Sequence, residues 1–158
     1  ATEEALQKID LISLLKTLCN DAKDLQYDIT LETELHRMAF EGNPLAIKRA
    51  FSNVINNAVR YANSAQITVE TKYKAILITI NDDGPGIPDN ELSEVFTPFY
   101  RAENSRSRDT GGTGLGLAVT QDIIKAHHGS IELHNRKPHG LSVIIRLPKM
   151  SAATANNS

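Results

Sequence analysis

The sequence Gly111-Gly112-Thr113-Gly114-Leu115-Gly116-Leu117 decides the fold assignment, because a glycine-rich loop here runs directly into a helix. Apolar residues recur at helical spacing behind it, and Gly129 stands where a glycine commonly ends a helix. Glycines let the backbone approach a ligand closely, and the first turn of a helix presents free N–H groups and a positive dipole end. The segment therefore predicts a polyphosphate site. The alternative is an ordinary flexible loop.

A second feature lies upstream, where the apolar run 75–80 ends in Asn81-Asp82-Asp83-Gly84-Pro85-Gly86-Ile87. This pattern predicts a buried strand followed by a tight glycine turn. Asp82 would then lie at the mouth of a pocket, where its carboxylate can accept a strong, directional hydrogen bond from an exocyclic amine. The alternative is a common surface Asp-Gly turn.

A third segment begins at Asn43-Pro44, which predicts a helix start because Asn caps free N–H groups and Pro fits the first helical position. Asn53, Asn57 and Arg60 follow at i, i+4 and i+7 and therefore project from one face. Asparagines inside a helix lower its propensity, so we expect a compensating role. An amide oxygen is a suitable Mg²⁺ ligand beside phosphate oxygens and waters. The alternative is an ordinary solvated polar face.

In this order the segments resemble the nucleotide-binding boxes of the catalytic and ATP-binding domain of bacterial sensor histidine kinases, of the osmosensor and envelope-stress-sensor type. The resemblance covers about residues 10–148 and implies the GHKL, or Bergerat, fold. The matching segments are 53–61 (N box), 82–87 (first glycine box), 96–101 (F box) and 112–117 (second glycine box). Four boxes in order are more specific than any one of them.

The resemblance implies a base-binding set. Asp82 would accept the hydrogen bond from the adenine amino group, and Gly84 and Gly86 would let the backbone close on the base. Ile87 belongs to the same nucleotide-binding set, and Tyr61 would lie near the adenine.

It also implies a phosphate-binding and catalytic set. Asn57 would be the Mg²⁺ ligand, with Asn53 one turn earlier beside the phosphates and the metal. Arg60 would contact phosphate, and Arg101 would approach the terminal phosphate during transfer. The second glycine box would present its backbone to the phosphates through Gly112, Thr113, Gly114, Leu115, Gly116 and Leu117.

The function that the resemblance implies is binding of Mg-ATP and donation of its γ-phosphate to a histidine on a separate dimerisation hairpin. The alternatives are a GHKL-type ATPase and a nucleotide-binding regulatory module without phosphotransfer. In those relatives a glutamate stands one turn before the Mg²⁺ asparagine; here that position is Asn53, which cannot act as a base. The kinase is therefore favoured.

The phosphoacceptor histidine of such kinases is followed by an acidic residue and, five positions on, by Pro. None of the 5 histidines here has that context. The expected partners are therefore the phosphoacceptor hairpin of the parent kinase and a response regulator. Because the dimerising hairpin is missing, we expect a monomer. His127 and His128 would end a helix, where a cation is favourable.

Composition and charge further restrict the possible partners and functions of the protein. A net charge of −2 over 158 residues gives no reason to expect a nucleic acid or an acidic membrane as partner. No P-loop occurs, since Leu117 stands where its lysine would be, and Cys19 is the only cysteine. No apolar run reaches membrane-spanning length and no signal peptide opens the chain, so we expect a cytoplasmic domain of an inner-membrane sensor kinase, without direct membrane contact.

The predicted fold class is α/β (α+β): a two-layer sandwich of a mixed five-stranded sheet with about three helices on one face and a mobile ATP lid at about 97–114. The expected domain is 10–148, between a linker at 1–9 and a disordered tail at 149–158. Its expected elements are helices at 9–24 and 44–61, a helical turn at 89–95, a helix after the second glycine box, and strands at 28–33, 37–41, 65–72, 75–82, 130–135 and 141–147.

Overall fold

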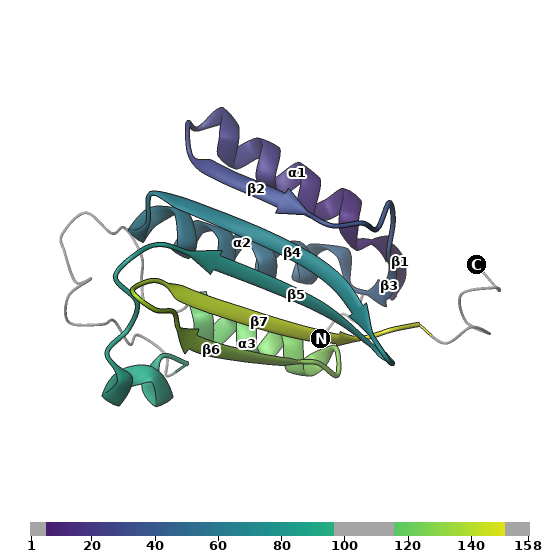
Figure 1. The fold of residues 1–158 in the computed structure, drawn as a ribbon. Helices are drawn as coiled ribbons and strands as arrows, with labels where there is room; N and C mark the ends of the chain where they lie inside the picture. The colour runs from purple at the N-terminus through teal and green to yellow at the C-terminus, as the bar shows by residue number, and fades with distance from the viewer. Residues whose placement is uncertain (1–5, 97–115, 151–158) are drawn as a thin grey trace.

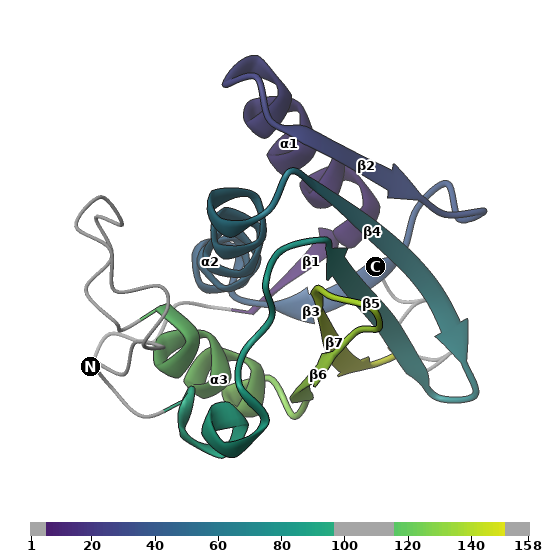
Figure 2. The same cartoon turned by 60° about the vertical axis from the view of Figure 1, so that its left-hand side comes forward.

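The structure is a computed structural model, and it describes residues 6–96 and 116–150. A five-stranded sheet with strand order β2-β4-β5-β7-β6 forms one layer, and three α-helices lie on one face of it (Figures 1 and 2). Strand β2 runs parallel to β4, and the remaining pairs are antiparallel. The predicted two-layer fold with a mixed five-stranded sheet is therefore confirmed.

The elements follow the predicted order closely. They are β1 (Gln7–Asp10), α1 (Leu11–Asp24), β2 (Asp28–Glu32), β3 (Ala39–Gly42), α2 (Pro44–Tyr61), β4 (Ser64–Lys72), β5 (Ala75–Asp82), the 3-10 helix η1 (Asp89–Glu94), α3 (Gly116–Ala126), β6 (Ser130–Asn135) and β7 (Leu141–Pro148). The whole of the predicted lid lies outside the described residues, as do most of the F box and of the C-terminal tail.

Strand β5 ends at Asp82, the first residue of the first glycine box, and one side of the strand faces the helices. Burial alternates along it, and Ile76, Ile78 and Ile80 are fully buried on the side that faces the helices. Because successive side chains of a strand point to opposite faces, Asp82 shares that side with them. The carboxylate therefore lies beneath the helices, with only 8% of its surface exposed.

Helix α2 begins and ends where the sequence predicts. The Asn43 side chain accepts a hydrogen bond from the Ala46 N–H at 3.1 Å, and Pro44 occupies the first turn. The buried stripe of α2 packs on β4 and β5, and the helix also contacts α3. The polar face that carries Asn53, Asn57 and Arg60 is thereby fixed relative to the end of β5.

The N-terminal region differs from the expectation. Residues 7–10, mostly assigned to a linker, form β1, which pairs with β3 in a separate two-stranded sheet. The Asp10 side chain accepts hydrogen bonds from the N–H groups of Ile12 and Met38, so it both caps α1 and fastens this small sheet. Two such short strands carry little periodicity, which explains why β1 was missed.

The end of α3 also differs in one detail. His128, rather than Gly129, adopts the left-handed conformation, with a φ of 66°. The His128 N–H bonds the carbonyl of Lys125, and the Gly129 N–H bonds that of Ile124. This is a Schellman motif shifted by one residue from the predicted glycine position. No helix within the described part of the chain has the length and apolar character needed to cross a membrane.

Candidate nucleotide-binding site

Asp82 is an oriented carboxylate at the end of β5. Its Oδ1 accepts hydrogen bonds from the N–H groups of Gly84 at 2.8 Å and Leu141 at 3.2 Å. Its backbone carbonyl accepts another from Arg136 Nη1 at 2.7 Å. Oδ2 accepts none from any described residue. One carboxylate oxygen is thus committed to the fold, and the second is available to a donor such as an exocyclic amine.

The neighbouring carboxylates of Asp82 and Asp83 have opposite electrostatic environments. Burial raises the pKa of Asp82, although the N–H groups of Gly84 and Leu141 act in the other direction. Hydrogen bonds from the Ser64 and Asn63 backbone, with one from the Ser64 hydroxyl, hold the pKa of Asp83 below its usual range. Asp83 therefore fastens the turn between α2 and β4, whereas ionised Asp82 carries a desolvation penalty.

The first glycine box approaches the end of α2 so closely that Gly84 requires a glycine. A Cβ at this position would lie 2.6 Å from the Tyr61 carbonyl oxygen. Gly86 has a φ of 77°, in the left-handed region that disfavours other residues. Gly84 thus lets the first glycine box lie against Tyr61, the last residue of the N box.

Asn53 connects α2 to the first residues of α3. Its Nδ2 donates to the Gly116 carbonyl and to the Thr120 hydroxyl, each at 3.3 Å. Thr120 is fully buried, and its hydroxyl donates to the Ala50 carbonyl at 3.4 Å. This amide is therefore engaged in joining two helices at the position where the resemblance places phosphates and metal.

The remaining α2 residues of the predicted set are less constrained. Asn57 is half-buried, and its side chain forms no hydrogen bond with any described residue. Arg60 is exposed and Tyr61 is 36% exposed. Both line a cavity of about 500 Å³. Its walls are formed by Arg60, Tyr61, Ala62, Asn63, Asp83, Gly84, Pro85 and His139.

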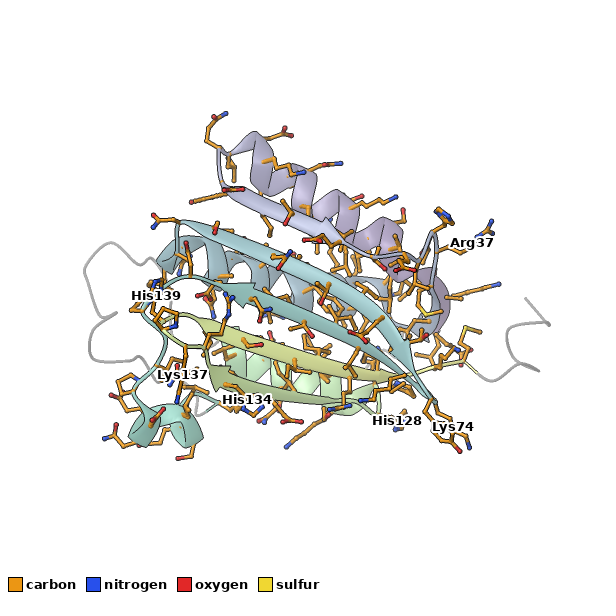
Figure 3. The ribbon with its side chains drawn as sticks, viewed as in Figure 1. Arg37, Lys74, His128, His134, Lys137 and His139 are labelled. Carbon is orange, nitrogen blue, oxygen red and sulfur yellow. The ribbon has the colours of Figure 1, made fainter. Side chains whose placement is uncertain are left out.

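This cavity adjoins the predicted site without coinciding with it. It joins the end of α2 to the first glycine box, yet neither Asp82 nor Asn57 is among its lining residues. His139 reaches it from the hairpin between β6 and β7, at the end of the sheet where β5 terminates (Figure 3). Of the second glycine box, Gly116 and Leu117 begin α3. Arg101, Gly112, Thr113, Gly114 and Leu115 lie outside the described residues.

Comparison with known families identifies the family of the domain that contains the candidate site. Residues 42–151 match the model of the histidine kinase-, DNA gyrase B- and HSP90-like ATPase family. The chain belongs to this family. The match spans α2, β5, α3 and the β6–β7 hairpin, so it contains every segment that forms the candidate site.

The relatives of this ATPase domain are sensor histidine kinases. CpxA of Escherichia coli strain K12 is 38% identical over 108 residues, which are 68% of this chain and 24% of CpxA. The catalytic domain of histidine kinase ThkA superposes with a TM-score of 0.78 at 25% identity, over 94% of this chain and 100% of that one. The histidine kinase domain of the Escherichia coli osmosensor EnvZ gives 0.73 at 31% identity, over 96% and 94%.

This chain is thus a catalytic ATPase domain of the histidine kinase type, as the four boxes indicate. It spans about a quarter of the length of the curated relatives that it matches.

One residue of the ATPase domain has a role that the sequence did not reveal. His127 Nδ1 lies 2.8 Å from the Ile123 carbonyl, and its Nε2 accepts the Asn43 N–H at 3.1 Å. Because a backbone carbonyl must accept and a backbone N–H must donate, this pair of bonds fits the tautomer that carries its proton on Nδ1. His127 therefore has a role beyond its place at the end of a helix, which the sequence did not require. It fastens α3 to the start of α2.

Asn135 and Arg136 are further residues that sequence reasoning missed. Both bond the first glycine box from the β6–β7 hairpin. They are 48 and 54 residues away from their partners, and no motif marks them.

Proposed function

We propose that this chain binds Mg-ATP and donates its γ-phosphate to a histidine on a separate domain of a two-component sensor kinase. The observation that carries the proposal is Asp82, a buried carboxylate that the fold orients through Oδ1 while Oδ2 has no described partner. Such a group suits the adenine amino group, because a charge-assisted hydrogen bond is strong and directional.

Magnesium fits the opposite end of the site. Asn57 offers an amide oxygen that no described residue occupies, one turn beyond Asn53 on the same helix face. Mg²⁺ commonly takes one or two protein oxygens together with phosphate oxygens and waters, so one amide beside a triphosphate is a suitable donor set. When bound, the ion would neutralise charge on the phosphates. Asn57 would hold it, and Arg60 would contact a phosphate.

The proposed reaction is an in-line transfer. A nitrogen lone pair of the acceptor imidazole attacks the γ-phosphorus while the bond from that phosphorus to the β,γ-bridging oxygen breaks. ADP leaves with the bond's electrons, and the acceptor nitrogen carries the phosphoryl group. Catalysis of this kind depends on positioning and charge stabilisation. The domain contributes Asn57 and Arg60 to it, with Arg101 proposed to reach the terminal phosphate.

The histidine acceptor is favoured over water because of Asn53. Its amide has no basic function and donates to Gly116 and Thr120. Water-directed hydrolysis needs a group that orients or deprotonates water. The sequence relatives are sensor kinases, which supports a parent protein that supplies the acceptor hairpin and a response regulator that receives the phosphoryl group. We propose a cytoplasmic location for this domain.

The test is calorimetric titration with a non-hydrolysable ATP analogue, with and without Mg²⁺, alongside the GTP analogue. We expect saturable binding that prefers adenine and strengthens with Mg²⁺. The second step supplies an isolated phosphoacceptor hairpin and radiolabelled ATP, and we expect label on its histidine. Absence of binding at millimolar nucleotide, or hydrolysis without labelled hairpin, would contradict the proposal.

A further inference from the structure

The hairpin between β6 and β7 holds both ends of the first glycine box. At the Asp82 end, Arg136 Nη1 donates to the Asp82 carbonyl at 2.7 Å and the Leu141 N–H donates to Asp82 Oδ1 at 3.2 Å. The hairpin is itself closed by the Arg136 N–H on the Gly140 carbonyl at 2.8 Å. The Asp82 carboxylate is therefore oriented from a part of the chain that belongs to no nucleotide-binding box.

At the other end of the box, one side chain bonds both backbone groups of Ile87. Asn135 Oδ1 accepts the Ile87 N–H at 2.9 Å, and Asn135 Nδ2 donates to the Ile87 carbonyl. Nδ2 also donates to Asp89 Oδ1 at 2.8 Å. An amide has a donor and an acceptor side by side, so it pairs with a residue's backbone as a neighbouring strand would.

The close approach of Asn135 also explains Gly86. A Cβ at Gly86 would lie 2.6 Å from Asn135 Oδ1. The residues from Asp82 to Ile87 are thus fixed at both ends by the same hairpin. Their backbone position relative to the Asp82 carboxylate depends on these bonds.

We propose that Asn135 is a positioning residue for adenine recognition, acting through the backbone of Ile87 without touching the nucleotide. It keeps the first glycine box at the distance from the base that lets Asp82 accept the 6-amino group. The proposal rests on the proposed function, because it presumes that the box contacts adenine.

The informative variant is Asn135→Asp, which has the same size. Its carboxylate still accepts the Ile87 N–H, but it has lost the donor group and faces the Ile87 carbonyl and the Asp89 carboxylate with a negative charge. Asn90→Asp is the matched control. Asn90 lies on the same 3-10 helix as Asp89, is exposed and forms no hydrogen bond with a described residue, so the same charge is added nearby without disturbing Ile87.

The measurement is the dissociation constant of two Mg²⁺ nucleotides: ATP and the purine riboside triphosphate that lacks the 6-amino group. We expect the wild-type domain and Asn90→Asp to prefer ATP. In Asn135→Asp, ATP binding should weaken about tenfold, which is the scale of losing the charge-assisted bond between Asp82 and the 6-amino group. The preference for ATP over the purine riboside triphosphate should disappear. In transfer to a supplied hairpin, the KM for ATP should rise while kcat at saturating ATP stays unchanged.

An unfolding curve gives the melting temperature of each variant, and each titration is run below that temperature. A change in nucleotide binding then reflects the positioning role and not a general loss of structure. Should Asn135→Asp fail to fold, Asn135→Ala removes all three side-chain bonds without adding charge and enters the same titrations. Unchanged ATP affinity and preference in the folded variant would overturn the positioning role alone. A wild-type domain that binds ATP without preferring the 6-amino group would overturn the adenine assignment, and this role with it.

Discussion

The two ends of the candidate site are built differently. At the base end, Asp82, Gly84 and Ile87 all take part in hydrogen bonds that the fold provides before any nucleotide binds. At the phosphate end, Asn57 has no hydrogen bond with a described residue and Arg60 is exposed. In the proposed function, recognition of the base would thus be prepared during folding, whereas the groups at the phosphate end would meet their partners when the ligand binds.

This difference predicts that the two ends contribute to different quantities, one to the free energy of binding and the other to the activation free energy of transfer. Groups that are preorganised lose little entropy on binding, so their contribution appears mainly as affinity. Groups that meet charge developing during transfer contribute to the rate. Substitutions at the base end should therefore change the dissociation constant, and substitutions at the phosphate end should change the transfer rate.

The largest expected effect is at Asn57. Asn57→Ala should lower phosphotransfer to a supplied hairpin by about 100-fold or more, because it removes the amide oxygen that we propose as the Mg²⁺ ligand. Binding of ATP without Mg²⁺ should not change. The matched control is Asn56→Ala, since Asn56 is the adjacent, exposed asparagine on the same helix. Mg²⁺-dependent transfer that survives in Asn57→Ala would remove this residue as ligand.

The second largest effect is expected at Asp82, at the base end of the candidate site. Asp82→Asn should weaken ATP binding by about 10- to 100-fold, the value of a hydrogen bond to a charged group. Because burial raises the pKa of Asp82, replacing it also removes a desolvation penalty. We therefore expect a melting temperature equal to or above that of the wild type, measured by circular dichroism beside the titration. Unchanged ATP affinity would refute the adenine assignment.

The adjacent carboxylate should respond in the opposite way. Asp83→Asn should lower the melting temperature and leave ATP affinity unchanged, because Asp83 accepts the N–H groups of Asn63 and Ser64. Its folded pKa is lowered, so its contribution is complete above the unfolded pKa of about 4 and is lost as pH falls through the folded value. Urea unfolding of both proteins from pH 7 downward should give curves that converge in acid. A stability difference between the two proteins that persists in acid would contradict the stabilising role of ionised Asp83.

The smallest effect concerns the junction of α2 and α3. Thr120→Val should destabilise the domain by about 1 kcal/mol, because two long hydrogen bonds are lost in a buried place while the volume is kept. Thr17→Val is the control, since its hydroxyl bonds the Ser13 carbonyl within α1 at an exposed position and should matter less. Denaturant unfolding measures both. An equal loss in the two variants would argue against a special role for the junction.

The sequence was most informative where local chemistry determines local structure. The bounds of α2 follow from the Asn43-Pro44 start and from the apolar stripe behind it, and β5 follows from its apolar run. Asp82 was placed at the strand end for the same reason. These features depend on neighbours along the chain, which the sequence displays directly.

The remaining features depend on contacts between distant segments. The pairing of β1 with β3 and the parallel pairing of β2 with β4 leave no periodic signal of their own. Asn135 resembles any polar residue at the end of a strand until the structure places Ile87 opposite it. The sequence could therefore name the residues of the boxes, but not the hairpin that holds one of those boxes in position.

The two bonds of His127 have a chemical consequence. A histidine accepts a phosphoryl group through an unprotonated ring nitrogen whose lone pair is free to attack. The Nδ1 proton of His127 is donated to the Ile123 carbonyl, and the lone pair on Nε2 is occupied by the Asn43 N–H. Both ring nitrogens of His127 are thus engaged within this fold, so this imidazole would not act as an acceptor in the proposed reaction.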